Sequence, residues 1–364
     1  MSKSITFLFD STYPIPTGGP KVVFEYANRL VENGWEVYIV YNYLASPVAF
    51  VSKMYHYFKD RLIWYFYRLR SKYPTSRLWF PIDSRVKEVF LPNIIYKNVP
   101  KTSLYVATAL PTSKFLKEYP ITDTRKFYIV QGYEKWCNRT DRDVRETYHY
   151  PLTKIVISNW LKNIIQNEEG LECVLAPNGF DFNYFQQFVP IEFRDKYCVS
   201  MMYHPGKAKG FYVAFEALKK VKLVYPQLKV NMFGAYDAPK KLPSWYYYVK
   251  CPNKEIHNKI YNSSAIFVSA SENEGWGLTV GEAMICGNAV VCTDNLGFKE
   301  MVMDGETGLL VPVGAVDEIA KNVIRLIEDD ILRQSLAING KRYIHRFSWD
   351  KSFQIVEKLL LSRL

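Results

Sequence analysis

The feature that most constrains the fold is a pattern that recurs along the chain: a short apolar strand, a glycine-rich loop, an amphipathic helix and another strand. Its first copy spans residues 4–41. There the run SITFLF is followed by the loop STYPIPTGGP, a helical pattern over residues 21–33 and a strand over residues 35–41. Strand–helix–strand units of this kind build parallel sheets. The pattern therefore predicts an α/β protein with parallel sheets.

The same pattern returns in the second half of the chain. We expect strands at 198–203, 228–233, 265–269 and 289–292, and helices at 213–224, 278–286 and 316–328. Between the halves lies a polar stretch, residues 181–196, without clear periodicity. A chain of 364 residues has room for two domains. We therefore predict Rossmann-like domains at residues 1–185 and 186–346, followed by a C-terminal helix at 347–364.

Composition sets the class of protein and the compartment that we expect. The chain is 48% hydrophobic and 23% charged, which excludes a disordered chain. No apolar run approaches the roughly 20 residues of a membrane span. The first ten residues do not have the pattern of a signal peptide. The six cysteines are scattered and form no Cys-x-x-Cys pair, which is typical of reduced thiols. These features predict a cytoplasmic protein.

The net charge of +11 points to an anionic partner. Basic and aromatic side chains are interleaved at helical spacing in residues 53–80. This segment favours peripheral contact with an anionic membrane surface, on the inner face of the membrane. A charged glycan acceptor, or a packed helix with solvated basic residues, explains the segment as well. No nucleic-acid motif is present, so we expect no nucleic-acid partner.

The most informative stretch is SASENEGWGLTVGEAMICGNAVVCTDNLGFKE, residues 269–300. Glu274 lies in the loop after a predicted strand, and Glu282 lies about one turn into the next helix. The backbone N–H groups of Gly277, Leu278 and Thr279 form the start of that helix, which favours a phosphate. A diphosphate bound there leaves Glu282 near ribose hydroxyls. Glu274 then faces a sugar beyond the phosphates.

At these residues the chain resembles the retaining glycosyltransferases of family 4. Their Glu-x7-Glu motif is Glu274–Glu282 here, within EGWGLTVGEAM, and the similarity continues through CGNAVVCTDNLGFKEMVMDGETGLLVP. The resemblance covers most of the second half of the chain. It implies the GT-B fold, two Rossmann-like domains with parallel sheets facing across a cleft, and a C-terminal helix that crosses back onto the first domain. It also implies transfer of a hexosyl unit from a nucleotide diphosphate sugar to a glycan or lipid-linked glycan, with retention and without a metal or cofactor.

The resemblance assigns further residues to the donor. In the family an Arg, followed five residues later by Lys-Gly, holds the donor diphosphate. Lys209-Gly210 fits the second part, while His204 stands in the place of the Arg and Lys207 is another source of positive charge. The family also brings the first strand–helix turn, here Gly18-Gly19, close to the donor phosphate and the acceptor. We therefore predict Glu274 and Lys209 as catalytic residues and His204, Lys207 and Gly19 as donor-binding residues.

The family's N-domain histidine, which helps to hold the transferred sugar, has no counterpart in this chain. The corresponding strand exit is Ile129-Val-Gln-Gly-Tyr-Glu134. Gln131 or Glu134 is the candidate for holding the sugar there, and Gly18 is a candidate acceptor contact. The alternative for Gln131 and Glu134 is a polar residue of the core.

Other functions stay open on the sequence alone. Asp141-Arg-Asp143 has the form of a metal-binding Asp-x-Asp, but it lies in the charged run TDRDVRE and is typical of a solvated surface. We therefore predict no metal site. The alternatives to a transferase are a nucleotide-sugar epimerase or a phosphorylase on a similar fold, or a catalytically silent subunit that binds sugar or membrane.

Overall fold

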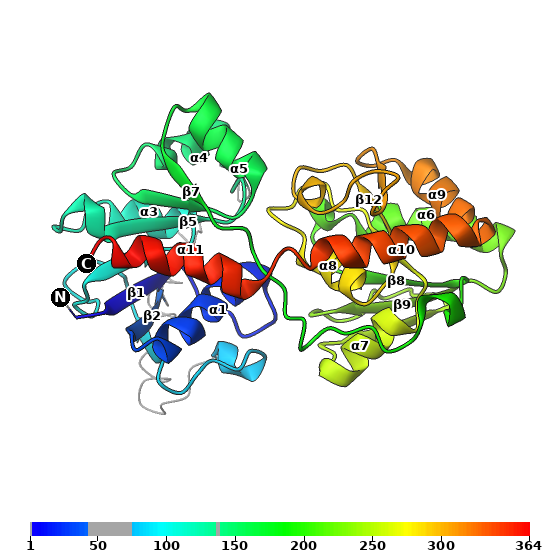
Figure 1. The fold of residues 1–364 in the computed structure, drawn as a ribbon, viewed down its shortest axis with the longest axis horizontal. Coiled ribbons are helices and arrows are strands. Elements are labelled where there is room, and N and C mark those ends of the chain that lie inside the picture. The colour runs from blue at the N-terminus through cyan, green and yellow to red at the C-terminus, as the bar shows by residue number, and fades with distance from the viewer. Residues whose placement is uncertain (1, 43–74, 136–138) are drawn as a thin grey trace. The chain divides into compact units, whose positions relative to one another are not determined.

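A computed structural model of the chain describes residues 2–42, 75–135 and 139–364 (Figure 1). The chain forms two compact units. Unit 1 contains the residues up to Pro177 together with Asp350–Leu364, and unit 2 contains Asn178–Trp349. Each unit has its own sheet.

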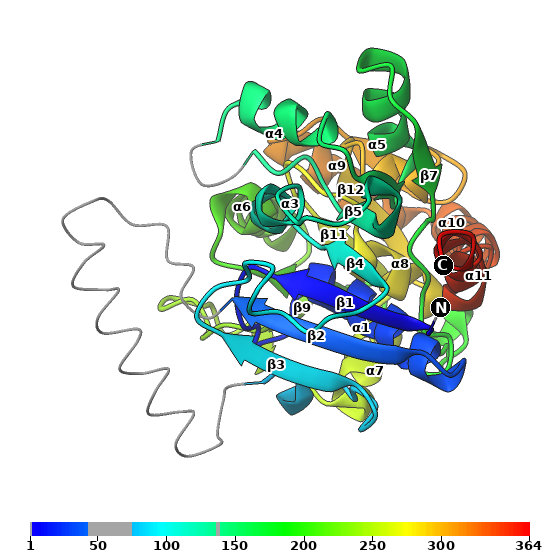
Figure 2. The ribbon, with the colours of Figure 1, turned by 90° about the vertical axis from the view of Figure 1, so that its left-hand side faces the viewer.

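Unit 1 is built on a parallel sheet of seven strands in the order β3-β2-β1-β4-β5-β6-β7 (Figure 2). The strands are β1 Ser4–Phe9, β2 Glu36–Asn42, β3 Lys87–Leu91, β4 Leu104–Ala107, β5 Lys126–Val130, β6 Thr153–Val156 and β7 Cys173–Leu175. Every residue of β1, β4 and β5 is buried. Burial on both faces is the normal state of a parallel sheet, because the crossover helices cover both sides.

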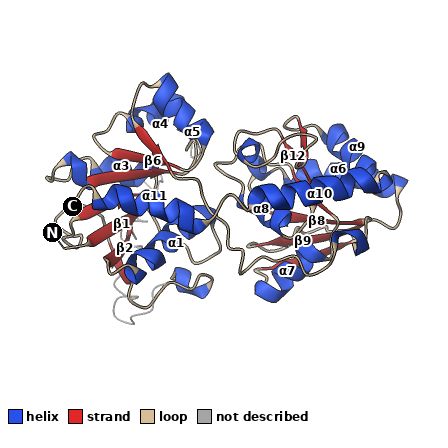
Figure 3. Cartoon of the chain, viewed as in Figure 1, coloured by secondary structure: helices blue, strands red, loops and turns tan. Residues whose placement is uncertain are grey.

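The helices of unit 1 flank this sheet (Figure 3). They are α1 Gly18–Glu32, α3 Leu110–Leu116, α4 Asp141–Tyr148, α5 Asn159–Asn163 and α11 Trp349–Leu361. Although α11 is the last element of the chain, it packs beside α1. The Tyr26 hydroxyl lies 2.8 Å from Ser352 Oγ, and the Trp35 indole donates to Glu357 at 3.1 Å. Leu360 of α11 is 1% exposed.

Unit 2 contains a second parallel sheet, with six strands in the order β10-β9-β8-β11-β12-β13. The strands are β8 Cys198–Tyr203, β9 Lys229–Gly234, β10 Tyr246–Lys250, β11 Ile266–Ser269, β12 Ala289–Thr293 and β13 Leu309–Val311. Its helices are α6 Phe211–Val224, α7 Lys254–Asn262, α8 Leu278–Ile285, α9 Val316–Glu328 and α10 Asp330–Ile344. One core cluster lines the face of the sheet that α6, α9 and α10 cover.

The prediction of two parallel α/β sheets is confirmed, and several local predictions need correction. The first helix begins at Gly18 rather than at residue 21, so both glycines of the Gly18-Gly19 pair lie in its first turn. Sequence analysis missed β3, β10 and α7, because charged and half-exposed residues interrupt their apolar pattern. Residues 43–74, which carry most of the basic–aromatic segment 53–80, lie outside the described part of the chain. Within the described part, no helix is long and apolar enough to cross a membrane.

Candidate functional site

In each sheet, the first strands are added in sequence toward one edge, and the later strands are added toward the other edge. The place where the two series meet is the switch point. In unit 1 this switch point lies between β1 and β4, and in unit 2 it lies between β8 and β11. The connections that leave two such strands run to opposite faces of the sheet, so a crevice opens at their carboxyl ends, where ligands bind. In unit 2 the loop after β8 carries Lys207 and Lys209, and the loop after β11 carries Glu274.

The structure brings Lys209 and Glu274 together at the switch point of unit 2. Lys209 Nζ lies 2.8 Å from Glu274 Oε1, across 65 positions of sequence. The same carboxylate oxygen accepts a hydrogen bond from Ser271 Oγ at 2.7 Å. The Lys209 side chain is 33% exposed and that of Glu274 is 17% exposed. Both groups are therefore held in place and still reach solvent.

The two loops fit tightly because Gly210 has no side chain. Its φ of +68° lies in the left-handed region, and a Cβ there would lie 1.8 Å from the carbonyl oxygen of Ala270. The Glu272 N–H also donates to the Ala208 carbonyl at 2.8 Å. The loop after β8 is thus pressed against the end of β11, which places Lys209 beside Glu274.

Helix α8 starts next to this pair. Its N-cap is Gly277, whose φ is +101° and whose Cβ, if present, would lie 2.5 Å from the Phe298 ring. Leu278 and Thr279 form the first turn. The first N–H groups of a helix have no partner within the helix, and the helix dipole makes that end positive. This end of α8 has the properties of an anion site.

Glu282 lies one turn further along α8 and is 6% exposed. Its Oε2 accepts a hydrogen bond from the Tyr261 hydroxyl at 3.2 Å. Burial, together with the negative charge of Glu282, raises the pKa of Tyr261 well above its ordinary value, so the phenol stays protonated and donates. Helix α7, which carries Tyr261, therefore orients the Glu282 carboxylate.

His204 and Lys207 occupy the loop before Lys209. His204 Nδ1 accepts a hydrogen bond from the Gly206 N–H at 2.9 Å, and its ring lies edge-on to Tyr236 with centroids 4.8 Å apart. Burial and the nearby charge of Lys209 lower the pKa of His204. The lowered pKa disfavours the charged form of the imidazole. Lys207 is exposed in the 3-10 turn Lys207–Lys209.

The candidate residues of unit 1 fall into two groups. Gln131 follows β5, and its side chain lies 3.6 Å from the position of a Cβ on Gly19, at the start of α1 next to Gly18. Its Nε2 donates to the Thr108 carbonyl at 3.3 Å. Gln131, Gly19 and Gly18 are therefore neighbours at the carboxyl edge of the sheet.

Glu134 has a different setting, because it is only 3% exposed. Both of its carboxylate oxygens accept from the Leu110 N–H, at 3.0 and 2.9 Å, and Oε1 also accepts from the Tyr128 hydroxyl at 3.2 Å. Burial raises the pKa of Glu134 to about 7, against the opposing effect of the Leu110 N–H and the Arg139 charge. Its contacts are those of a core residue that caps the start of α3.

The Asp-x-Asp of unit 1 lies in the exposed first turn of α4. Asp143 Oδ2 accepts from the N–H of Thr140 at 2.7 Å in a capping box, and Asp141 pairs with Lys135 at 2.8 Å. Hydrogen bonds from Lys135 and from Thr140 lower the pKa values of Asp141 and Asp143 respectively. Among the residues that the structure describes, no group of three His, Cys, Asp or Glu side chains is arranged to hold a metal ion.

Sequence reasoning missed two residues that orient the site. Ser271 holds Glu274, and Tyr261 holds Glu282. Ser271 lies three positions before Glu274 within SASENEG, so the motif itself carries that signal. Tyr261 belongs to α7, whose position next to α8 no local pattern predicts.

Comparisons with known proteins agree with this architecture. Residues 186–343 match the family model for group 1 glycosyl transferases. An uncharacterised glycosyltransferase of Methanocaldococcus jannaschii is 34% identical over 255 residues, which are 68% of this chain and 62% of that protein. The phosphatidyl-myo-inositol mannosyltransferase of Mycobacterium tuberculosis is 24% identical over 210 residues, which are 54% of this chain and 56% of that protein. The crystal structure of HepE from Anabaena, in complex with UDP and glucose, superimposes with a TM-score of 0.72 at 16% identity, over 99% of this chain and 100% of that one.

These findings define the class of protein. The fold is GT-B, and residues 186–343, somewhat less than half of the chain, match the group 1 glycosyl transferases, in line with the family resemblance of the motif. The chain spans about half the length of the mycobacterial relatives that it matches.

Proposed function

We propose that this chain is a retaining glycosyltransferase. It moves a hexosyl unit from a nucleotide diphosphate sugar to a hydroxyl group of a glycan or lipid-linked glycan. The observation that carries the proposal is the Lys209–Glu274 pair at the switch point of unit 2, 2.8 Å apart and next to the positive end of α8. The cation and the helix N-terminus suit the diphosphate of such a donor. The two carboxylates suit its sugar and the hydroxyl groups of its ribose.

Each group has a proposed role. Lys209 exchanges its contact with Glu274 for the donor diphosphate and neutralises charge as it leaves. The N–H groups at the start of α8, at Gly277, Leu278 and Thr279, bind the same phosphates. Glu282 accepts hydrogen bonds from ribose hydroxyls. Glu274, released from Lys209, faces the transferred sugar and stabilises the positive charge that develops at its anomeric carbon.

The chemical step balances without an enzyme nucleophile. The acceptor hydroxyl oxygen attacks the anomeric carbon from the side of the leaving group, and the bond from that carbon to the diphosphate oxygen breaks. The acceptor proton passes to the leaving phosphate oxygen. The products are the lengthened acceptor, with the configuration retained, and the free nucleoside diphosphate.

Further parts of the proposal concern unit 1. Gln131, with Gly18 and Gly19 beside it, is the proposed contact to the acceptor or the transferred sugar. Glu134 supports this edge from the core by holding the start of α3. Peripheral contact with an anionic membrane through residues 53–80 also remains a prediction. The mycobacterial relative, which is named for a lipid acceptor, is consistent with a lipid-linked acceptor here.

A thermal-shift panel tests the donor site. UDP, GDP, dTDP, ADP and CMP are added to the wild type, to Lys209→Ala and to the control Lys220→Ala, whose Nζ is paired with Asp317 on the surface. A ligand at 100 times its Kd stabilises the protein by about 2.7 kcal/mol, which raises the Tm by roughly 2 °C per kcal/mol or a little less for a chain of this size. We expect one nucleoside diphosphate to shift the wild type and the control but not Lys209→Ala.

Turnover then separates the proposal from its rivals. Nucleoside diphosphate release that needs an acceptor supports a transferase. Conversion of the nucleotide sugar without an acceptor indicates an epimerase, and dependence on inorganic phosphate indicates a phosphorylase. If no nucleotide shifts the wild type and none is released, the enzyme proposal is wrong and a silent binding subunit takes its place.

A further inference from the structure

Unit 2 has a cavity at the edge of its sheet opposite to the candidate donor site. It has a volume of about 480 Å³ and lies where β8, β9 and β10 begin. The donor residues follow the carboxyl ends of β8 and β11. Since β9 runs from Lys229 to Gly234 at about 3.3 Å per residue, the two edges lie roughly 16 Å apart. The cavity is therefore separate from the site already described.

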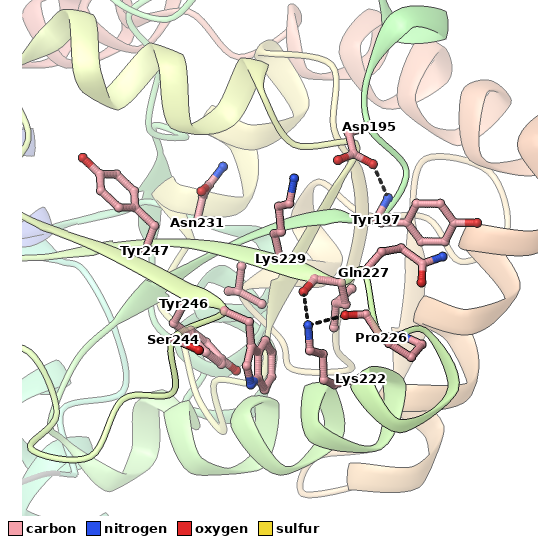
Figure 4. A pocket seen from close by; sticks show the side chains of 13 residues that line it. Asp195, Tyr197, Lys222, Pro226, Gln227, Lys229, Asn231, Ser244, Tyr246 and Tyr247 are labelled. Atoms are coloured by element: carbon pink, nitrogen blue, oxygen red, sulfur yellow. Dashed lines mark hydrogen bonds between the residues drawn. The ribbon is translucent and has the colours of Figure 1, made fainter.

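Aromatic and hydrogen-bonding side chains share the walls of this cavity (Figure 4). Tyr247 of β10 and Asn231 of β9 face each other across the strand pair, and Lys229 lies two residues before Asn231. Side chains two residues apart on a strand point to the same face, and Figure 4 shows Tyr247, Asn231 and Lys229 projecting to one side of the sheet. They form a row of a ring, an amide and an ammonium group.

Hydrogen bonds within the protein already hold part of this row in place. Asn231 Nδ2 donates to Ser263 Oγ at 2.9 Å, which sets the orientation of the amide. Around the edge, Lys222 Nζ donates to the Leu228 carbonyl at 2.9 Å and lies 5.4 Å from the centre of the Trp245 ring. Tyr247, in contrast, is 62% exposed. A large ring is thus presented to solvent beside oriented polar groups.

We propose that this cavity binds carbohydrate. A pyranose has an apolar C–H face and a rim of hydroxyls. It is therefore complementary to an exposed Tyr ring beside an amide and an ammonium group. The volume lies within the range of small-ligand sites. Two lysines and one acid, Lys222, Lys229 and Asp195, line the cavity. The Lys222 ammonium is already bonded to backbone carbonyls, so Lys229 and Asp195 are the opposite charges left to face a ligand, which suits recognition through hydroxyls better than a polyanion.

The role that follows rests on the proposed function. A polymeric acceptor or product bound at this edge stays near the protein between transfers. Tethering of this kind raises the effective concentration of the chain end at the transfer site. The carbohydrate taken here is therefore the glycan acceptor or product at a position remote from its growing end.

Affinity electrophoresis of the full chain tests the proposal. Native gels, run toward the cathode, contain a phosphate-free α-mannan, dextran, glycogen or an unsulfated galactan. These polymers are neutral, because a protein with a net charge of +11 binds any polyanion. The variants are Tyr247→Ala, Tyr247→Trp and the control Phe188→Ala, an aromatic residue that is 59% exposed and does not line the cavity.

We expect at least one polymer to retard the wild type, Phe188→Ala and Tyr247→Trp, and the apparent Kd of Tyr247→Ala to be at least tenfold weaker. Absence of retardation in all four polymers, or equal retardation of Tyr247→Ala, overturns the proposal. Lys209→Ala is run in the same gels and should be retarded like the wild type. A nucleotide shift without retardation leaves the transferase proposal standing and rejects the cavity. Retardation with neither a nucleotide shift nor nucleotide release rejects the transferase proposal and leaves carbohydrate binding at the cavity standing.

Discussion

The carboxyl group of Glu134 is almost completely buried. Its protonation state therefore contributes to the stability of unit 1. Its folded pKa of about 7 lies above the ordinary value of 4.5. Between these two pH values the unfolded chain has lost the proton while the folded protein keeps it. Stability should therefore fall as the pH rises from 4.5 to 7, by about 3 kcal/mol in all.

Glu134→Gln tests this prediction. An amide still accepts the hydrogen bond from the Leu110 N–H and carries no charge. We expect the variant to lose most of the decrease in Tm between pH 4.5 and 7 and to be more stable than the wild type at pH 8. Thermal unfolding followed by circular dichroism over this pH range measures both effects. Parallel pH profiles for the two proteins would contradict the assignment.

Glu282 is also buried, but it lies near the start of α8, where we propose that the donor binds. Glu282→Ala should abolish the nucleotide-dependent thermal shift, since the ribose contact is lost. Tyr261→Phe removes only the hydroxyl that orients Glu282, so we expect a partial loss of the shift. Isothermal titration with the nucleoside diphosphate that shifts the wild type ranks the three proteins. Equal affinity for all three would place Glu282 outside the donor site.

At the scale of elements, the start of α8 depends on a glycine that no other residue replaces. Gly277→Ala puts a side chain at a φ of +101° and 2.5 Å from the Phe298 ring. Gly314→Ala is the matched control, because Gly314 also has a positive φ, +80°, but no atom within 4 Å of the added Cβ. The control should cost about 1–2 kcal/mol in backbone strain alone.

We expect Gly277→Ala to cost roughly 1–3 kcal/mol more than the control, because the ring must move or the helix must shift. It should also weaken nucleotide binding, whereas Gly314→Ala should not. Urea unfolding gives the free energies, and the thermal-shift panel gives the binding. Similar values for the two variants would show that Phe298 accommodates the added methyl group without cost.

The elements also show which features of the fold are predictable from the sequence and which are not. The strand–loop–helix of residues 269–300 was predictable, because glycines, carboxylates and apolar runs follow one another in the order in which they act. Helix α7 was not predictable, because most residues of its sequence KEIHNKIYN are polar. Its stability depends on packing against neighbouring elements, which no local pattern shows. The contact between Lys209 and Glu274 depends on β8 lying next to β11. Strand order is a property of the folded sheet, so each residue was predictable but their pairing was not.

At the scale of the whole molecule, the last helix belongs to the first unit. Leu360 of α11 is 1% exposed, and the neighbouring Leu361 is 41% exposed. Leu360→Ala should therefore destabilise unit 1 by about 2–5 kcal/mol, while Leu361→Ala should change stability by no more than about 0.5 kcal/mol.

Hydrogen exchange locates the effect of Leu360→Ala. Protection of α1 should decrease in this variant, and protection of α6 in unit 2 should stay as in the wild type. Leu361→Ala should leave both helices unchanged. Equal loss of protection in α1 and α6 would mean that the two units unfold as one.

The return of α11 to unit 1 has a consequence for synthesis on the ribosome. Unit 2 is an insertion between Pro177 and Asp350, and all of its strands and helices up to α10 have been made before α11 emerges. Domains generally fold as they are made, beginning from the N-terminus. Here the order of completion is inverted: the unit that is begun first is finished last. The apolar surface of unit 1 that α11 covers is therefore exposed while the whole of unit 2 is translated.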